Sequence, residues 1–135
     1  MRVDALLAVA VGSALGGVAR HLLGHAAGAV LGRDLPWGTL VVNVLGCFAL
    51  GVCLALVLGG RKNADPSQEV LVAFLFAGVL GGFTTFSAFG RETFELVREG
   101  RGTMAAIYVV GSNVLALGAV WAGWRLGASV APMAH

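Results

Sequence analysis

Charged residues are scarce in this sequence. Asp, Glu, Lys and Arg make up only 12% of the 135 residues, whereas apolar residues make up 58%. Ordinary soluble domains carry about 25% charged residues. A soluble chain with so little polar surface would aggregate, so the composition excludes a soluble globular domain and favours a surface that faces lipid. The net charge of +2 comes without a dense Lys/Arg cluster, which argues against nucleic-acid binding.

Cysteines are few, and the usual ATPase motif is absent. Cys47 and Cys53 are six residues apart in one apolar run, so on a helix they point in different directions. We predict small buried hydrophobic side chains here rather than a disulfide or a metal pair. No Gly-x-x-x-x-Gly-Lys-Ser/Thr phosphate loop occurs. His21 and His25 lie near the end of the first apolar run, where we interpret them as interfacial residues rather than catalytic bases.

Four apolar runs are long enough to cross a membrane as helices, which takes about 20 residues each. We predict spans at residues 5–24, 37–59, 70–90 and 103–126. The matching runs that follow the first one indicate a retained helix rather than a cleaved signal peptide. The sequence therefore predicts an all-α, multi-pass protein of the cell membrane, with residues 1–135 in a single four-helix domain.

Glycine spacing and charge refine the ends of these spans. Gly24 and Gly28 continue an i+4 pattern that extends the first helix, and the amphipathic segment 91–99 is expected to continue the third. Gly12 and Gly16 are also four apart, which lets membrane helices approach closely.

Apart from Arg20, which lies inside or near the end of the first span, Lys and Arg are evenly divided between the two sides of the membrane. The terminal side holds Arg2, Arg61, Lys62 and Arg125, and the other side holds Arg33, Arg91, Arg98 and Arg101. The positive-inside rule needs an excess on one side to fix an orientation. We therefore predict insertion in both orientations, which permits an antiparallel homodimer with its two-fold axis in the membrane plane.

Acidic residues are missing from the predicted spans, and the nearest is Asp4. Proton-coupled transport usually needs a titratable group at membrane depth, so this mechanism is disfavoured. Beyond Arg20, His21 and Arg125, which lie near the ends of their spans, the polar side chains of the spans are mainly neutral hydroxyls and amides. Such a lining can replace the water around a small anion without trapping the ion, as conduction requires.

These neutral groups are concentrated in three places. Thr39 and Asn43 share one face of the second span, and Tyr108 and Ser112 share one face of the fourth, because each pair is four residues apart. The third place is segment 81–90, which holds three glycines, two threonines, a serine and three phenylalanines.

The third span is predicted to be broken in its middle. Gly81 and Gly82, followed by Thr84 and Thr85, make a poor helix, so we expect the break at Gly81 and Gly82. A break there would free backbone groups at membrane depth. The alternative is a continuous helix whose threonines bond back to the preceding turn.

Phe86 and Phe89 are three residues apart and share a face of this span. Their ring edges carry partial positive charge and can attract an anion, whereas the alternative is ordinary apolar packing.

Three runs of residues resemble the Fluc/CrcB family of fluoride channels. Residues 81–89 read Gly-Gly-Phe-Thr-Thr-Phe-Ser-Ala-Phe, which looks like the third-helix signature of that family. Residues 38–46 are similar to its second-helix signature, and residues 16–20 to its first-helix pattern. The resemblance implies an antiparallel, dual-topology homodimer in the lipid bilayer, with two pores that export fluoride passively and lower its cytoplasmic concentration.

The resemblance also implies site residues. A structural sodium ion at the dimer centre would be held by the backbone carbonyls of Gly81 and Thr84, and Arg20 would lie in the vestibule. The fluoride pathway would use Asn43, Phe86, Phe89, Tyr108 and Ser112, with Thr39, Ser87 and Thr85 as further candidates. The sequence departs from the family at Ala116, where the polar track of the fourth helix would continue with a hydroxyl.

Two other classes of protein fit four short spans. A small multidrug transporter would normally need a membrane-embedded carboxylate in its first helix, and Asp4 lies too near the terminus for that role. A non-transporting assembly subunit would use the polar faces only to hold helices together.

Overall fold

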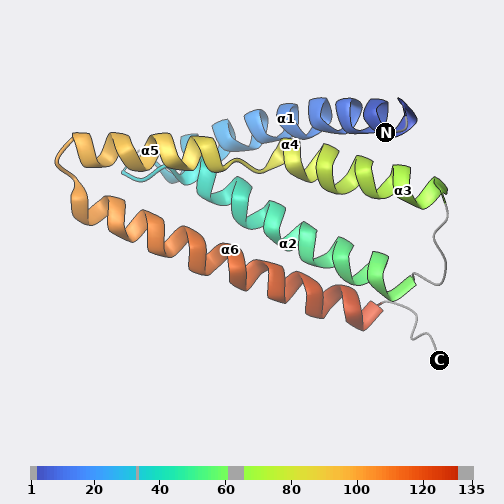
Figure 1. The fold of residues 1–135 in the computed structure, drawn as a ribbon. Coiled ribbons are helices and arrows are strands. Elements are labelled where there is room, and N and C mark those ends of the chain that lie inside the picture. The colour runs from blue at the N-terminus through green and yellow to red at the C-terminus, as the bar shows by residue number, and fades with distance from the viewer. Residues whose placement is uncertain (1–2, 33, 61–65, 131–135) are drawn as a thin grey trace.

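The computed structural model describes residues 3–32, 34–60 and 66–130, and this part of the chain is helical apart from short connections (Figure 1). The helices are α1 Val3–Leu31, α2 Trp37–Gly60, α3 Pro66–Val72, the π-helix η1 Ala73–Leu80, α4 Gly81–Phe83, α5 Phe86–Arg98 and α6 Gly102–Val130. Both ends of the described chain lie at the same end of the bundle.

Four helical segments are long and apolar enough to span a membrane, as the sequence predicts: Val3–Leu31, Trp37–Val57, Gln68–Arg98 and Gly102–Val130. The first ends at Leu31, because Gly32 adopts a φ of 95°, which ends the helix. The third continues to Arg98, as expected from the amphipathic segment 91–99. The chain is therefore a multi-pass membrane protein. Of the charges counted across the membrane, Arg2, Arg33, Arg61 and Lys62 lie outside the described residues.

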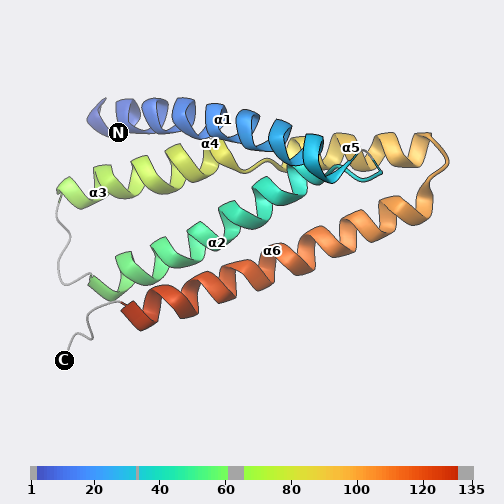
Figure 2. The same ribbon diagram turned by 180° about the vertical axis from the view of Figure 1, so that it is seen from behind.

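The helices form two closely packed pairs, as both views show: α2 lies along α6, and α1 lies along the segment from α3 to α4 (Figures 1 and 2). A Cβ atom added to Gly51 would lie 2.1 Å from the Val120 carbonyl oxygen of α6. One added to Gly16 would lie 2.2 Å from the Val79 carbonyl oxygen of η1. These glycines therefore allow the backbones to touch, as the spacing of Gly12 and Gly16 predicts.

The third spanning segment loses its helical conformation at two residues. Thr84 has φ −80° and ψ 157°, and Thr85 has φ −150° and ψ 116°. Gly81 and Gly82 are helical, so the position predicted for the break is wrong. Gly82 instead packs on α1, where an added Cβ would lie 2.6 Å from the Ser13 carbonyl oxygen. The glycines meet a packing demand, and the extended conformation begins two residues later.

The described interior is small, and much apolar surface is exposed. Val42, Ala55 and Tyr108 are almost fully buried, whereas Leu117 is 72% exposed and Phe86 is 79% exposed. A soluble protein would not leave such side chains in water, but a lipid-facing surface accommodates them.

Candidate functional site

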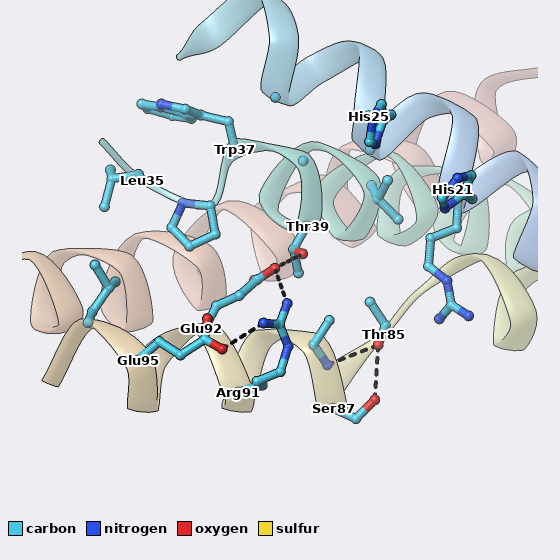
Figure 3. Close-up of a pocket in the computed structure, with 18 of the residues that line it drawn as sticks. His21, His25, Leu35, Trp37, Thr39, Thr85, Ser87, Arg91, Glu92 and Glu95 are labelled. Atoms are coloured by element: carbon cyan, nitrogen blue, oxygen red, sulfur yellow. Dashed lines mark hydrogen bonds and ion pairs between the residues drawn. The ribbon is translucent and has the colours of Figure 1, made fainter. Parts of the chain in front are cut away.

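Two cavities meet at the interruption of the third segment. The larger cavity, about 1160 Å³, lies between the second half of α1, the start of α2 and α5; we call it the vestibule (Figure 3). Its charged lining residues are Arg20, Asp34, Arg91, Glu92, Glu95, Glu99 and Arg101.

The smaller cavity, about 340 Å³, lies nearer the middle of the long helices, between α2, η1, α5 and α6; we call it the inner cavity. Its polar side chains come from Asn43, Cys47, Thr84, Thr85, Ser112 and Asn113. Phe86 and Phe89 also line it. Thr85 lines both cavities, so the extended residues form the wall between them.

Asn43 holds the extended backbone in place from α2. Its Nδ2 donates to the Thr85 carbonyl oxygen at 3.0 Å, and its Oδ1 accepts from the Thr85 amide at 2.8 Å. One amide side chain therefore satisfies both backbone groups of a residue outside the helix. The amide has two N–H donors, so the second one is left for another partner.

The carbonyls of Gly81 and Thr84 lose their usual helical partners at this point. In a continuous helix the Thr85 amide would bond to Gly81, but it donates to Asn43 Oδ1. The Ala88 amide would bond to Thr84, but it donates to the Thr85 hydroxyl at 3.2 Å. Two backbone carbonyl oxygens are therefore left without their usual helical amide partners.

A guanidinium already lies beside one of these oxygens. Arg20 Nη1 donates to the Thr84 carbonyl oxygen at 3.3 Å. A carbonyl oxygen has two lone pairs, so this bond leaves a second acceptor direction.

Three aromatic rings follow one another from the inner cavity into the interior. The ring centres of Phe86 and Phe89 are 5.5 Å apart, and those of Phe89 and Tyr108 are 5.2 Å apart. Phe86 and Phe89 lie on one face of α5, as their spacing predicts. Tyr108 is only 1% exposed.

Glu92 is a residue that the sequence analysis missed. Its Oε1 accepts from the Thr39 hydroxyl and its Oε2 from the Tyr108 hydroxyl, each at 2.8 Å. Glu92 lies on the continuation of the third helical segment to Arg98, beyond the predicted span 70–90. Glu92 follows Phe89 by three residues and shares its helix face, a spacing that was a usable signal.

The hydroxyl of Ser112 is a buried polar group of the site that lacks a hydrogen-bond partner among the described residues. Ser112 is only 7% exposed. It lines the inner cavity one helical turn after Tyr108, and Ala116 lines the same cavity one turn further on. A buried hydroxyl without a partner is unusual in proteins and indicates a place where a ligand or water bonds.

Comparisons with known proteins agree with this architecture. A family model described as CrcB-like protein, Camphor Resistance (CrcB), matches residues 7–124. The chain belongs to the CrcB family. The fluoride-specific ion channel FluC of Rhodospirillum centenum is 48% identical over 121 residues, which cover 90% of this chain and 93% of that protein. The protein of the same name from Nitrobacter winogradskyi is 43% identical over 90% of this chain and 93% of its own length. The one from Geobacter sulfurreducens is 45% identical over 87% of this chain and 92% of its own length.

In this CrcB-family protein, the predicted site residues are divided between the two cavities. Gly81, Thr84, Asn43, Phe86, Phe89 and Ser112 line the inner cavity. Arg20, Thr39 and Ser87 line the vestibule, and Thr85 belongs to both. Tyr108 lies behind them, between Phe89 and Glu92.

Proposed function

We propose that this chain is the subunit of a fluoride-selective ion channel that lowers cytoplasmic fluoride by passive export across the cell membrane. The observation that carries the proposal is the inner cavity. Its described lining offers hydroxyls, amides and phenylalanine rings between membrane-spanning helices, and it contains no carboxylate. The relatives named fluoride-specific ion channel FluC support the same function.

An anion at this depth needs protein donors in place of water. The Ser112 hydroxyl has no partner among the described residues, and Asn43 retains one N–H beyond its bond to Thr85. The edges of Phe86 and Phe89 add weak positive partial charge. Because none of these groups carries a full charge, the ion is held weakly enough to leave, as a channel requires.

The vestibule supplies the entrance to this path. Arg20 is a positive charge in its lining. The hydroxyl of Thr85, which lines both cavities, lies 3.2 Å from the hydroxyl of Ser87 in the vestibule. Thr39 and Tyr108 lie beside the path, where Glu92 anchors their hydroxyls. Arg91 approaches Glu92 to 3.7 Å, which offsets the negative charge that would repel an anion.

The channel is proposed to be an antiparallel homodimer in the lipid bilayer. A pore needs a closed wall, yet Phe86, which lines the inner cavity, is 79% exposed in the single chain. A second copy over this side would cover the ring and close the cavity. The four-to-four balance of Lys and Arg supports insertion in both orientations, which such a dimer requires.

A structural sodium ion at the centre of this dimer is part of the proposal. The carbonyls of Gly81 and Thr84, which Asn43 and Thr85 deprive of their helical partners, would hold it. Two such oxygens from each subunit would give four around a two-fold axis, a donor set suited to a hard cation. The ion would supply positive charge and link the subunits.

Fluoride efflux from liposomes that contain only this protein tests the proposal. The Ser112→Ala variant should slow efflux about tenfold or more, because a hydrogen bond to a charged group contributes about 1.5–3 kcal/mol. Ser129→Ala is the matched control, because this exposed hydroxyl bonds to the Leu126 carbonyl oxygen in the last turn of α6. A subunit that only packs would pass no fluoride at all. Equal efflux from the Ser112→Ala and Ser129→Ala variants would show that the Ser112 hydroxyl does not contact fluoride on its path.

A further inference from the structure

One face of α1 lines the vestibule with small and polar residues. Gly17, His21, Gly24, His25 and Gly28 recur at three- and four-residue intervals, and all of them line the cavity. The two histidines are four residues apart, so they lie one turn apart on the same face. Figure 3 shows both imidazoles on α1, across the vestibule from Glu92 and Glu95 of α5.

The two imidazoles are close enough to share one ligand. Their ring centres are 5.6 Å apart, their planes are inclined by 27°, and both side chains are exposed. Metal–nitrogen bonds of about 2.0–2.1 Å place two ligand nitrogens of one ion roughly 3 Å apart. Histidines four residues apart on one helix face can hold a single metal ion between them, which requires only side-chain rotation.

The surroundings leave room for an ion with its water ligands. An added Cβ atom at Gly17 or Gly28 would meet nothing within 4 Å, so the turns on both sides of the pair are open. The described charged lining holds four carboxylates, Asp34, Glu92, Glu95 and Glu99, against three arginines. A cation is therefore not repelled from this cavity.

We propose that His21 and His25 form a binding site for one divalent first-row transition-metal ion in the vestibule. Imidazole nitrogens at i and i+4 on one helix face suit Cu²⁺, Ni²⁺ and Zn²⁺, with Cu²⁺ bound most tightly. The described residues contain no group of three or more His, Cys, Asp or Glu side chains that could hold a metal, so water completes the coordination and the ion exchanges readily. The site does not depend on the proposed fluoride function.

Cu²⁺ binding to purified full-length protein without a histidine tag tests this site, with pulsed electron paramagnetic resonance to count coordinated imidazoles. The chain has three histidines, so single variants separate them completely. The unaltered protein should show two imidazoles on one Cu²⁺. His21→Ala and His25→Ala should each leave one and weaken binding at least about tenfold, because the second ligand acts at high effective concentration.

Two controls separate chelation from other effects. His135→Ala should bind Cu²⁺ as the unaltered protein does. The double variant His25→Ala with Ala26→His keeps the number of imidazoles but breaks the four-residue spacing, so it should bind like His25→Ala alone. Thermal unfolding should be unchanged in all variants without metal, because both histidines are exposed. Unaltered Cu²⁺ affinity in His21→Ala, or full affinity in the shifted variant, would overturn the proposal.

Discussion

Replacing Asn43 with alanine separates a role in conduction from a role in folding. The substitution removes two hydrogen bonds to Thr85, of 3.0 and 2.8 Å. Polar contacts between membrane helices contribute about 0.6 kcal/mol each on average, so the expected loss of stability is about 1 kcal/mol. Thr85 lines both cavities, where water can replace the lost partner. The Asn43→Ala protein should therefore still fold and assemble.

The expected loss of conduction is much larger. A hydrogen bond to a charged group contributes about 1.5–3 kcal/mol, and each 1.4 kcal/mol changes a rate about tenfold. Fluoride efflux should therefore fall roughly 10- to 100-fold. A fluoride electrode measures efflux from liposomes, and chemical unfolding and subunit association are measured on the same preparation. Normal efflux from Asn43→Ala, or a loss of efflux explained entirely by misfolding, would refute the assigned role.

The remaining predictions concern the rings, the carboxylate, the ion and the orientation. Phe86→Ile and Phe89→Ile should keep the dimer but slow fluoride efflux sharply, because isoleucine keeps the apolar bulk and lacks the ring edge that attracts an anion; efflux equal to that of the unaltered protein in both variants would assign these residues to packing alone. Glu92→Gln should lower the free energy of unfolding by about 1–3 kcal/mol, since one of the hydroxyls of Thr39 and Tyr108 loses its acceptor. Chemical unfolding measures this, and a variant as stable as the unaltered protein would contradict the hydrogen-bond network. Replacing sodium by a bulky organic cation should promote dimer dissociation and slow efflux, and unchanged behaviour without sodium would exclude the ion. Reporter fusions at the C-terminus should be active in both compartments, and one clean orientation would contradict dual insertion.

The spans are predictable from the sequence because they depend on local composition. A run of about 20 apolar residues identifies a helix that crosses lipid wherever its neighbours lie. The close packing of Gly16 on η1 is predictable for a similar reason, since small residues four apart mark an approaching helix.

The position of the interruption depends on partners that are distant in sequence. Thr85 is held extended by Asn43, which lies 42 residues earlier, and Gly82 stays helical against Ser13 of α1. No pattern within the third span contains either contact. The spacing of Glu92 from Phe89 indicates the helix face that they share, but it does not identify the hydroxyl partners of Glu92, which come from α2 and α6.

The most direct test of the central claim compares fluoride and chloride efflux from liposomes that contain only this protein. The proposed channel should release fluoride rapidly along its gradient, without ATP or a proton gradient, and should release chloride no faster than empty liposomes. Equal release of both anions, or no release of fluoride from correctly assembled protein, would contradict the proposed function.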